Sequence, residues 1–365
     1  MRPFRLRAEE HRWSRAGAAS LPSALVSDSV LPETALPGIA LPEGLSARPL
    51  TGEDVDAVAA LLTAAEAVDH TGEHFAAEDL TEWWVNELVD LSRDGVAVCD
   101  GETIVGYATV VAPPTFRDAF GVHLEGRVHP ERRGEGIGRA LLAWQLARGE
   151  QVHAERHPEA PARLTVTAYT SMPSLEALLR RAGLEQLRWF FHMGRLLTDL
   201  PPVPVVEGVD LGPFTWNRDD EVRLAHNVAF TDHYGSSERD GTSWEVMFTG
   251  QRAFRPDLSV LAVERGLVVG YVLTYVYESD TAATGRRSAY YGQIGVLPAA
   301  RGRGLARAMI AEALRVAAAG DCQAAGLQVD GENSSGALRL YEGLGFATTH
   351  TQLSWSRRLA PLPRR

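Results

Sequence analysis

The 365-residue sequence contains no lysine, so all of its basic side chains besides histidine are arginines. Asp and Glu number 47 against 36 arginines, and the formal net charge is −11. A chain of this sign is repelled by phosphate backbones and by anionic lipid. The composition therefore argues against nucleic acid or an anionic membrane as the main partner.

Cysteine is also scarce, because Cys99 and Cys322 are the only two. Two widely separated thiols form neither a disulfide framework nor a zinc-binding pattern. Both stand in or beside apolar runs of the sequence. We therefore expect buried, inert thiols rather than nucleophiles or metal ligands.

Long hydrophobic runs are missing as well. No apolar stretch approaches the roughly 20 residues that a membrane-spanning helix needs. The arginine-rich start, residues 1–15, is not followed by an apolar segment and so lacks the pattern of a signal peptide. We expect a cytoplasmic protein without a membrane partner.

The length and a hydrophobic content of 45% suit two globular domains. Leu-Pro occurs four times before residue 45, which predicts either an extended arm or a disordered one, because proline disfavours helix. A second proline-rich stretch follows residue 200 and is typical of a linker. We predict an N-terminal arm over 1–45, a first domain over 46–200, a linker over 201–208 and a second domain over 209–365.

The two predicted domains repeat one order of motifs. A valine-rich hairpin containing Val-Gly-Tyr occurs near residues 96–111 and again near 260–276. Each hairpin is followed by a strand that ends before a proline, then by closely spaced glycines and a helical pattern. This self-similarity indicates a duplicated α/β module.

The stretch Tyr290–Ala308 gives the strongest chemical signal. A short strand stops at Pro298, and Gly302 and Gly304 then precede a helical pattern that starts at Leu305. Glycine allows a tight turn and the close approach of a ligand, because it has no Cβ. The first amides of a helix have no intrahelical partners and lie at the positive end of its dipole. The stretch therefore predicts a site for phosphate or pyrophosphate.

The spacing of these glycines excludes two common phosphate-binding motifs. There is no Gly-x-x-x-x-Gly-Lys-Ser/Thr, and no Gly-x-Gly-x-x-Gly with an acidic residue about 20 positions later. The motif Arg-x-x-Gly-x-Ala at 301–306 instead resembles the pyrophosphate loop of the GNAT acyltransferases, which bind acetyl-CoA. Farther along, Asn333, Tyr341 and the Gly-Phe pair at 345–346 resemble the second part of that family's signature.

The resemblance covers residues 45–359 and implies an α/β protein of two tandem GNAT folds, each a mixed, mostly antiparallel sheet flanked by helices. It implies an N-acetyltransferase that moves an acetyl or short acyl group from CoA to the amine of a small molecule. A non-catalytic protein that binds acyl-CoA for regulation is the alternative. The tandem arrangement is similar to that of the mycothiol synthases, which acetylate a cysteinyl-glucosaminyl-inositol amine. An amine of the natural-product or aminoglycoside type is an equally possible acceptor.

The second domain carries the expected acetyl-CoA site. The resemblance implies that a strand end pairs with the pantetheine arm and that the loop backbone holds the pyrophosphate. One of the implied residues, Asn333, also fits a simple helix cap. The residues expected to bind CoA are Ile294, Gly295, Val296, Arg301, Gly302, Arg303, Gly304, Leu305, Ala306, Arg307 and Asn333.

Tyr341 is the predicted catalytic acid, because the resemblance implies a tyrosine here that protonates the departing CoA thiolate. Its place in an apolar stripe fits a packing role as well. The general base stays open, since the strand before the loop has no carboxylate where family members often have Glu. Tyr290 is our candidate to hold a water there. Asp232, His233 and Glu238 lie in a loop expected to line the acceptor site, although a solvated polar loop also explains them.

The first domain repeats the glycine loop without the later polar pair. Aligning the ends of the following helices places Ser171 where Asn333 stands and Leu179 where Tyr341 stands. We therefore expect a degenerate first domain that shapes the substrate cleft, and a catalytic second domain. The possible second CoA loop consists of Val128, Arg133, Gly134, Gly136 and Gly138.

Overall fold

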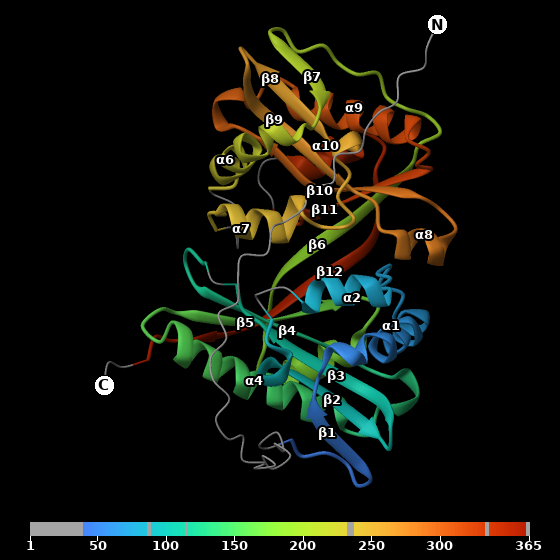
Figure 1. Ribbon diagram of the computed structural model, residues 1–365, viewed down its shortest axis with the longest axis vertical. Helices are drawn as coiled ribbons and strands as arrows, with labels where there is room; N and C mark the ends of the chain where they lie inside the picture. Colours follow the sequence, from blue (N-terminus) through green and yellow to red (C-terminus); the bar gives the residue numbers. More distant parts are fainter. Residues whose placement is uncertain (1–38, 86–88, 114, 232–236, 333–335, 363–365) are drawn as a thin grey trace, which may run out of the picture. The chain divides into compact units, whose positions relative to one another are not determined.

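The computed structural model describes residues 39–85, 89–113, 115–231, 237–332 and 336–362, all within one compact unit, Ala35–Arg365. Most of the predicted N-terminal arm therefore lies outside the described residues. The described strands form one continuous 12-stranded sheet (Figure 1). We call the elements from β1 to β6 the N-terminal half and those from β7 to β12 the C-terminal half. No helix that the structure describes is long and apolar enough to cross a membrane.

The N-terminal half follows the order of the predicted module. Two 3₁₀ turns, Gly52–Asp54 and Pro130–Arg132, precede its first and fourth helices. Its elements are β1 (Leu45–Pro49), α1 (Val55–Asp69), α2 (Ala77–Trp84), α3 (Leu91–Asp94), β2 (Gly95–Asp100), β3 (Thr103–Val111), β4 (Phe120–Val128), α4 (Ile137–Arg156), β5 (Ala162–Tyr169), α5 (Pro173–Arg181) and β6 (Glu185–Leu196).

The C-terminal half repeats this order with two changes among the described residues. Two helices, not three, precede its hairpin, and an added helix, α8, lies between the hairpin and the loop-bearing strand. A π-helical turn, Glu245–Thr249, extends α7, and a 3₁₀ turn, Pro298–Ala300, precedes the glycine loop. The elements are β7 (Val209–Pro213), α6 (Asp219–Ala229), α7 (Gly241–Trp244), β8 (Val260–Glu264), β9 (Leu267–Tyr275), α8 (Glu278–Thr284), β10 (Ser288–Val296), α9 (Leu305–Ala319), β11 (Ala324–Asp330), α10 (Ala337–Glu342) and β12 (Ala347–Leu359).

The strand pairing confirms the predicted fold class. Among the described strands of each half, the only parallel pair is the loop-bearing strand with the strand after the long helix, β4 with β5 and β10 with β11. All other neighbours in the described sheet are antiparallel. The long helices α4 and α9 provide the crossover connections that parallel neighbours require.

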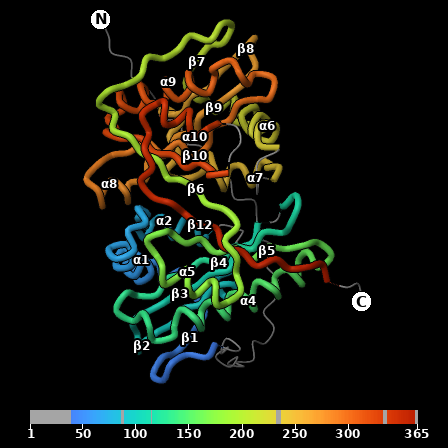
Figure 2. The backbone as a smooth tube through the Cα atoms, turned by 180° about the vertical axis from the view of Figure 1, so that it is seen from behind, coloured from blue at the N-terminus to red at the C-terminus, as the bar shows by residue number. Residues whose placement is uncertain are grey.

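The last strand of each half is exchanged. β6, at the end of the N-terminal half, pairs with β11 of the C-terminal half, whereas β12, at the end of the chain, pairs with β5 of the N-terminal half. The two exchanged strands also pair with each other, and they run side by side between the halves (Figure 2). Neither half therefore completes its sheet with its own last strand. The domain boundaries drawn from the sequence stay a prediction.

Apolar and polar residues alternate along the central strands, and the apolar ones lie on the face of the sheet that the long helices cover. On β12, Leu353 and Trp355 lie in the core under α4, and on β11, Leu327 and Val329 lie in the core under α9. The intervening residues are polar, and they point to the opposite face. On that face α1 and α6 cover the outer strands of their own halves and reach as far as β4 and β10. The four strands between β4 and β10 in the sheet order, β5, β12, β6 and β11, thus present an open polar face.

Candidate functional site

The glycine loop of the C-terminal half has the geometry expected of an anion site. Gly302 and Gly304 have φ angles of +77° and +80°, which only glycine adopts without strain. A Cβ added at either position would meet no atom within 4 Å, so the space above the loop is open. Gly304 is the N-cap of α9, and the first amides of that 15-residue helix point into this space.

The arginines of the loop, Arg301 and Arg303, contact other parts of the protein. Arg301 donates from Nε to the carbonyl of Val296 at 3.2 Å and from Nη2 to the carbonyl of Ala229 at 2.9 Å. Arg303 forms an ion pair with Glu264 at 2.9 Å. These contacts fix the loop, and the amides at the start of α9 are the donors that a pyrophosphate would use.

The strand before this loop parts from its neighbour at a bulge. β10 pairs with β11 only from Ser288 to Tyr291, and the register between β10 and β9 then shifts across Gly292. Beyond the bulge, β10 pairs with β9 alone, so one backbone edge of Gln293–Val296 has no strand partner in the described sheet. An extended chain bearing amides can pair with such an edge.

Tyr341 lies on the α9 face beside this parting. The ring is buried and packs edge-on against Phe346, which packs in the same way against Tyr291, the last β10 residue paired with β11. Its hydroxyl makes no hydrogen bond to another described residue. Burial raises the pKa of Tyr341 to about 12, so the phenol holds its proton at neutral pH.

Tyr290 lies on the opposite face of β10, in a group of tyrosines with Tyr275 and Tyr277. The ring centroids of Tyr277 and Tyr290 are 6.1 Å apart. The ring of Tyr275 lies against the Gly292 bulge, where an added Cβ would come within 2.6 Å of it. The Tyr275 hydroxyl is buried without a hydrogen-bond partner among the described residues. Burial raises the pKa of all three phenols, so each is a donor at neutral pH.

The N-terminal half has a second loop of nearly the same geometry. Gly134 and Gly136 have φ angles of +87° and +98°, and Gly136 is the N-cap of α4. Arg133 donates to the carbonyl of Val128 at 3.2 Å, as Arg301 does to Val296. Gly138 lies in the first turn of α4, where an added Cβ would meet Leu178 and Val128 at 3.7 Å, an ordinary contact distance. The loop is therefore shaped for an anion as well.

The strand that leads to this second loop differs. The register between β4 and β3 is regular, without the bulge found in β10. Along the part of β4 that has left β5, the carbonyl of Glu125 accepts from Gln145 at 2.6 Å and that of Gly126 accepts from Arg127 at 3.0 Å. The corresponding carbonyls of β10, those of Gln293 and Ile294, accept from no described side chain. The backbone edge in the N-terminal half is less available to a ligand.

The counterpart of Tyr341 is Leu179, as the sequence alignment of the two halves predicts. The amide of Leu184 donates to the carbonyl of Leu179 at 3.0 Å, and the amide of Phe346 donates to that of Tyr341 at 3.1 Å. Leu179 is fully buried. The N-terminal half thus has no hydroxyl at the acid position.

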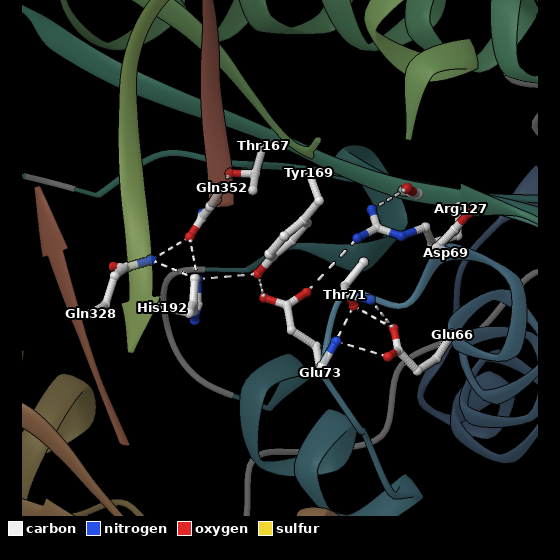
Figure 3. A network of polar contacts seen from close by, with 12 residues as sticks. Glu66, Asp69, Thr71, Glu73, Arg127, Thr167, Tyr169, His192, Gln328 and Gln352 are labelled. Atoms are coloured by element: carbon white, nitrogen blue, oxygen red, sulfur yellow. Dashed lines mark hydrogen bonds and ion pairs between the residues drawn. The ribbon is translucent and has the colours of Figure 1, made fainter. Parts of the chain in front are cut away.

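A polar network that sequence reasoning missed crosses the open face at the exchanged strands (Figure 3). Glu73, from the loop between α1 and α2, accepts a hydrogen bond from the Tyr169 hydroxyl at 2.7 Å and lies 3.9 Å from an Arg127 nitrogen. His192 of β6 contacts Gln352 of β12 at 2.9 Å. Gln328 of β11 contacts both residues of that pair. The alternation of polar and apolar residues along each strand could have predicted that these side chains share a polar face. The exchange of β6 and β12, which brings them together, has no signal within a single strand.

Some predicted residues lie outside the described part of the chain. Asn333, Asp232 and His233 are among them. Glu238 is described and exposed, and it forms no hydrogen bond with another described side chain.

A comparison with known protein families shows which family the chain belongs to. A sequence model of the acetyltransferase (GNAT) family matches the chain twice, at residues 57–163 and 225–346. The chain belongs to the GNAT acetyltransferase family. The two matches fall in the two halves, so the predicted tandem arrangement is confirmed. It is an N-acetyltransferase that uses acetyl-CoA to acetylate a small molecule.

Individual relatives agree with this assignment. The chain is 34% identical to a mycothiol acetyltransferase of Frankia alni, over 83% of this chain and 91% of that protein. It is 31% identical to a mycothiol acetyltransferase of Streptomyces coelicolor, over 84% and 92% of the two chains. The structure of a GCN5-related N-acetyltransferase from Sphaerobacter thermophilus matches with a TM-score of 0.71 and 26% identity, over 89% of this chain and 99% of that one. A tandem GNAT protein of the clavulanic acid pathway shares the fold, with a TM-score of 0.64.

Proposed function

We propose that the C-terminal half carries out the acetyl transfer. The pyrophosphate of acetyl-CoA binds the first amides of α9, from Leu305 to Arg307, and the pantetheine arm pairs with the free edge of β10. An amide of that edge polarises the thioester carbonyl, as an oxyanion hole does. Tyr341 protonates the departing thiolate. The acceptor lies on the open polar face, between the α1–α2 loop and α8.

The observation that carries this proposal is the parting of β10 and β11 at Gly292. It frees backbone donors and acceptors immediately before a loop built for an anion, and the order along the chain matches the order of groups along acetyl-CoA. The N-terminal half has the loop but lacks the bulge and the phenol. In this proposal the N-terminal half is a structural partner of the C-terminal half, and the number of CoA molecules bound per chain shows whether it also binds CoA.

Gly304→Val is expected to weaken CoA binding at least about tenfold, or ~1.4 kcal/mol. A β-branched side chain at φ +80° strains the loop and fills the space that the pyrophosphate needs. Titration calorimetry with CoA measures the affinity. Gly101→Val is the matched control, because that glycine also has a positive φ and open space but lies in the β2–β3 turn. Equal CoA affinity in wild type and a folded Gly304→Val protein would remove this loop from the site.

Gly136→Val makes the same change in the N-terminal half. Turnover should stay within about threefold of wild type, because that half contributes no chemistry in our proposal. Calorimetry on the same protein gives the number of CoA molecules bound per chain, one if the N-terminal loop is empty and two if it binds. A loss of turnover as large as that of Gly304→Val would mean that the N-terminal half works too.

For the acceptor, we propose a small primary amine with several hydroxyl or amide groups, because the open face offers hydrogen-bonding side chains of Gln, His, Thr and Tyr. The relatives make the amine acetylated by mycothiol acetyltransferases the first candidate. The absence of a carboxylate on β10 favours a different amine, of the natural-product type, as the second. Release of CoA thiol from acetyl-, propionyl- and longer acyl-CoA, screened against both classes of amine, distinguishes them.

For the compartment we propose the cytoplasm, where acetyl-CoA is available to the enzyme. Fractionation of producing cells tests this.

A further inference from the structure

The C-terminal half has no proton acceptor on the strand that approaches the thioester. β10 presents Tyr290 there, and burial raises the pKa of this phenol, with the nearby Tyr277, Glu73 and Asp280 acting in the same direction. A neutral phenol cannot take a proton from an amine at neutral pH. Primary amines are mostly protonated at that pH and do not attack a carbonyl until they lose a proton. A base must reach this place from another element.

One of the carboxylates that act on Tyr290 belongs to an element without a counterpart in the other half. Asp280 lies on α8, the helix inserted between β9 and β10. The described residues between β3 and β4 contain no such helix. Asp280 also raises the pKa of Tyr277, behind the larger effect of burial. Tyr277 is the N-cap of α8, three residues before Asp280, and its ring centroid lies 6.1 Å from that of Tyr290. The carboxylate therefore lies close to the tyrosine group beside the bulge.

The partner of this carboxylate comes from the N-terminal half. Nδ1 of His74, in the α1–α2 loop, lies 3.0 Å from Oδ1 of Asp280, 206 residues along the chain. The loop is held firmly, because the amide of Gly72 donates to Glu66 at 2.8 Å and the Tyr169 hydroxyl donates to Glu73. The His74 side chain is 25% exposed, so solvent and ligand reach it.

The contact with Asp280 fixes the state of the imidazole. A carboxylate accepts, so Nδ1 carries the proton, and in the neutral ring Nε2 is then a proton acceptor. Nε2 has no hydrogen-bond partner among the described residues. An imidazole oriented by a carboxylate in this way is the arrangement of a general base. We propose that His74 is the general base for acetyl transfer in the C-terminal half and that Asp280 orients it.

This assignment rests on the proposed function and completes its chemistry. Nε2 of His74 takes one proton from the ammonium of the acceptor, and the freed nitrogen lone pair forms a C–N bond with the thioester carbon. When the tetrahedral intermediate collapses, the C–S bond breaks and its electron pair goes to sulfur. Sulfur takes the proton of Tyr341, and the phenolate takes the second proton from nitrogen. The imidazolium releases its proton to water.

Glu73 is the other carboxylate near Tyr290, and its contacts argue against the same role. One oxygen accepts from the Tyr169 hydroxyl and the other lies near Arg127, so both face the N-terminal half. A purely structural contact between the halves is the remaining alternative to the His74 base. A variant that keeps the contact but loses the titrating group separates the two roles.

His74→Asn is that variant, because the Asn amide can donate to Asp280 but cannot take a proton. The assay measures CoA release from acetyl-CoA with the amine that shows the highest kcat/KM in the screen, over a range of pH. The wild type should show kcat/KM rising with pH as one group loses its proton. In His74→Asn this limb should disappear and kcat should fall at least about tenfold. CoA affinity and melting temperature should match those of wild type.

Further variants identify the group that titrates. Asp280→Asn should lower kcat, because the imidazole then loses the carboxylate that orients it. The other charged or titratable groups that face the pair, Glu73, Asp79, Tyr277 and Tyr290, remain in both variants. His70→Asn is the control, since that exposed histidine has a left-handed φ of 49°, which Asn tolerates. It should leave the profile unchanged.

The results separate this assignment from the proposed function. An active His74→Asn protein that keeps the limb, or a Glu73→Gln protein that loses it, would overturn the base but leave the C-terminal half as the site. If His74→Asn is inactive, added imidazole should restore CoA release in His74→Ala, whose small side chain leaves room for the ring, and failure to do so with acetyl-CoA still bound would also overturn it. A wild type that binds acetyl-CoA yet releases no CoA with any amine would overturn the proposed function and the base together.

Discussion

Tyr341→Phe is expected to lower turnover at least about tenfold while CoA affinity stays nearly unchanged. A positioned general acid contributes ~10²–10⁴-fold when it supplies a proton in the transition state. Burial raises the pKa of Tyr341 to about 12, which keeps the proton on the phenol throughout the neutral range. The Phe ring retains the packing against Phe346, so only the proton is removed. Single-turnover measurement of CoA release isolates this step from product release.

The control for this change is Tyr291→Phe. The Tyr291 ring packs on the other side of Phe346, and its buried hydroxyl has no hydrogen-bond partner among the described residues. Removing that hydroxyl should leave turnover within about twofold of wild type. If Tyr341→Phe behaves like the control once chemistry limits the rate, Tyr341 is a packing residue and another group protonates the thiolate.

Trp355→Ala should destabilise the N-terminal half by about 3–5 kcal/mol, although the residue belongs to the last strand of the chain. Trp355 is 3% exposed, lies in the core under α4 and pairs with Val166 of β5. The guanidinium of Arg180 lies 5.4 Å from the ring centroid. Truncation would leave a cavity among residues of the N-terminal half. Urea unfolding measures the loss, and hydrogen exchange shows where protection is lost.

In the Trp355→Ala experiment, the location of the lost hydrogen-exchange protection tests whether β12 belongs to the core of the N-terminal half. Protection should fall in β5 and α4 together with β12, because these elements share one core. Ser354→Ala, one position earlier and on the open face, is the matched control and should cost little. A loss of protection confined to residues 209–346 would contradict the exchange of the last strands.

Much of this architecture could be predicted from local signals. The glycines at 302 and 304 indicated a strand, a tight turn and a helix start, because their freedom at positive φ is a property of the residue itself. The tandem arrangement could be predicted because the hairpin motif is a local sequence pattern that occurs twice. The match of Leu179 to Tyr341 followed from counting back from Gly183 and Gly345, both of which have the positive φ that ends such helices.

The sequence did not predict features that depend on which segments meet. β6 and β12 alternate in the same way whether each pairs with its own half or with the other, so the exchange has no local signature. The bulge at Gly292 arises from the fit of one strand against the next. The contact between His74 and Asp280 joins two polar loops, and polar loop residues ordinarily face solvent. The single clue was the extra polar segment between the second hairpin and its loop-bearing strand, which became α8.

The exchange also sets an order of events during synthesis. Domains near the N-terminus usually fold while the rest of the chain is still being translated. Here β5 finds its antiparallel neighbour only after residues 347–359 have left the ribosome. Until then its backbone edge is open, and an open edge can pair with another nascent chain. A premature stop codon before β12 would therefore remove the strand that completes the sheet of the N-terminal half, although that half is synthesised first.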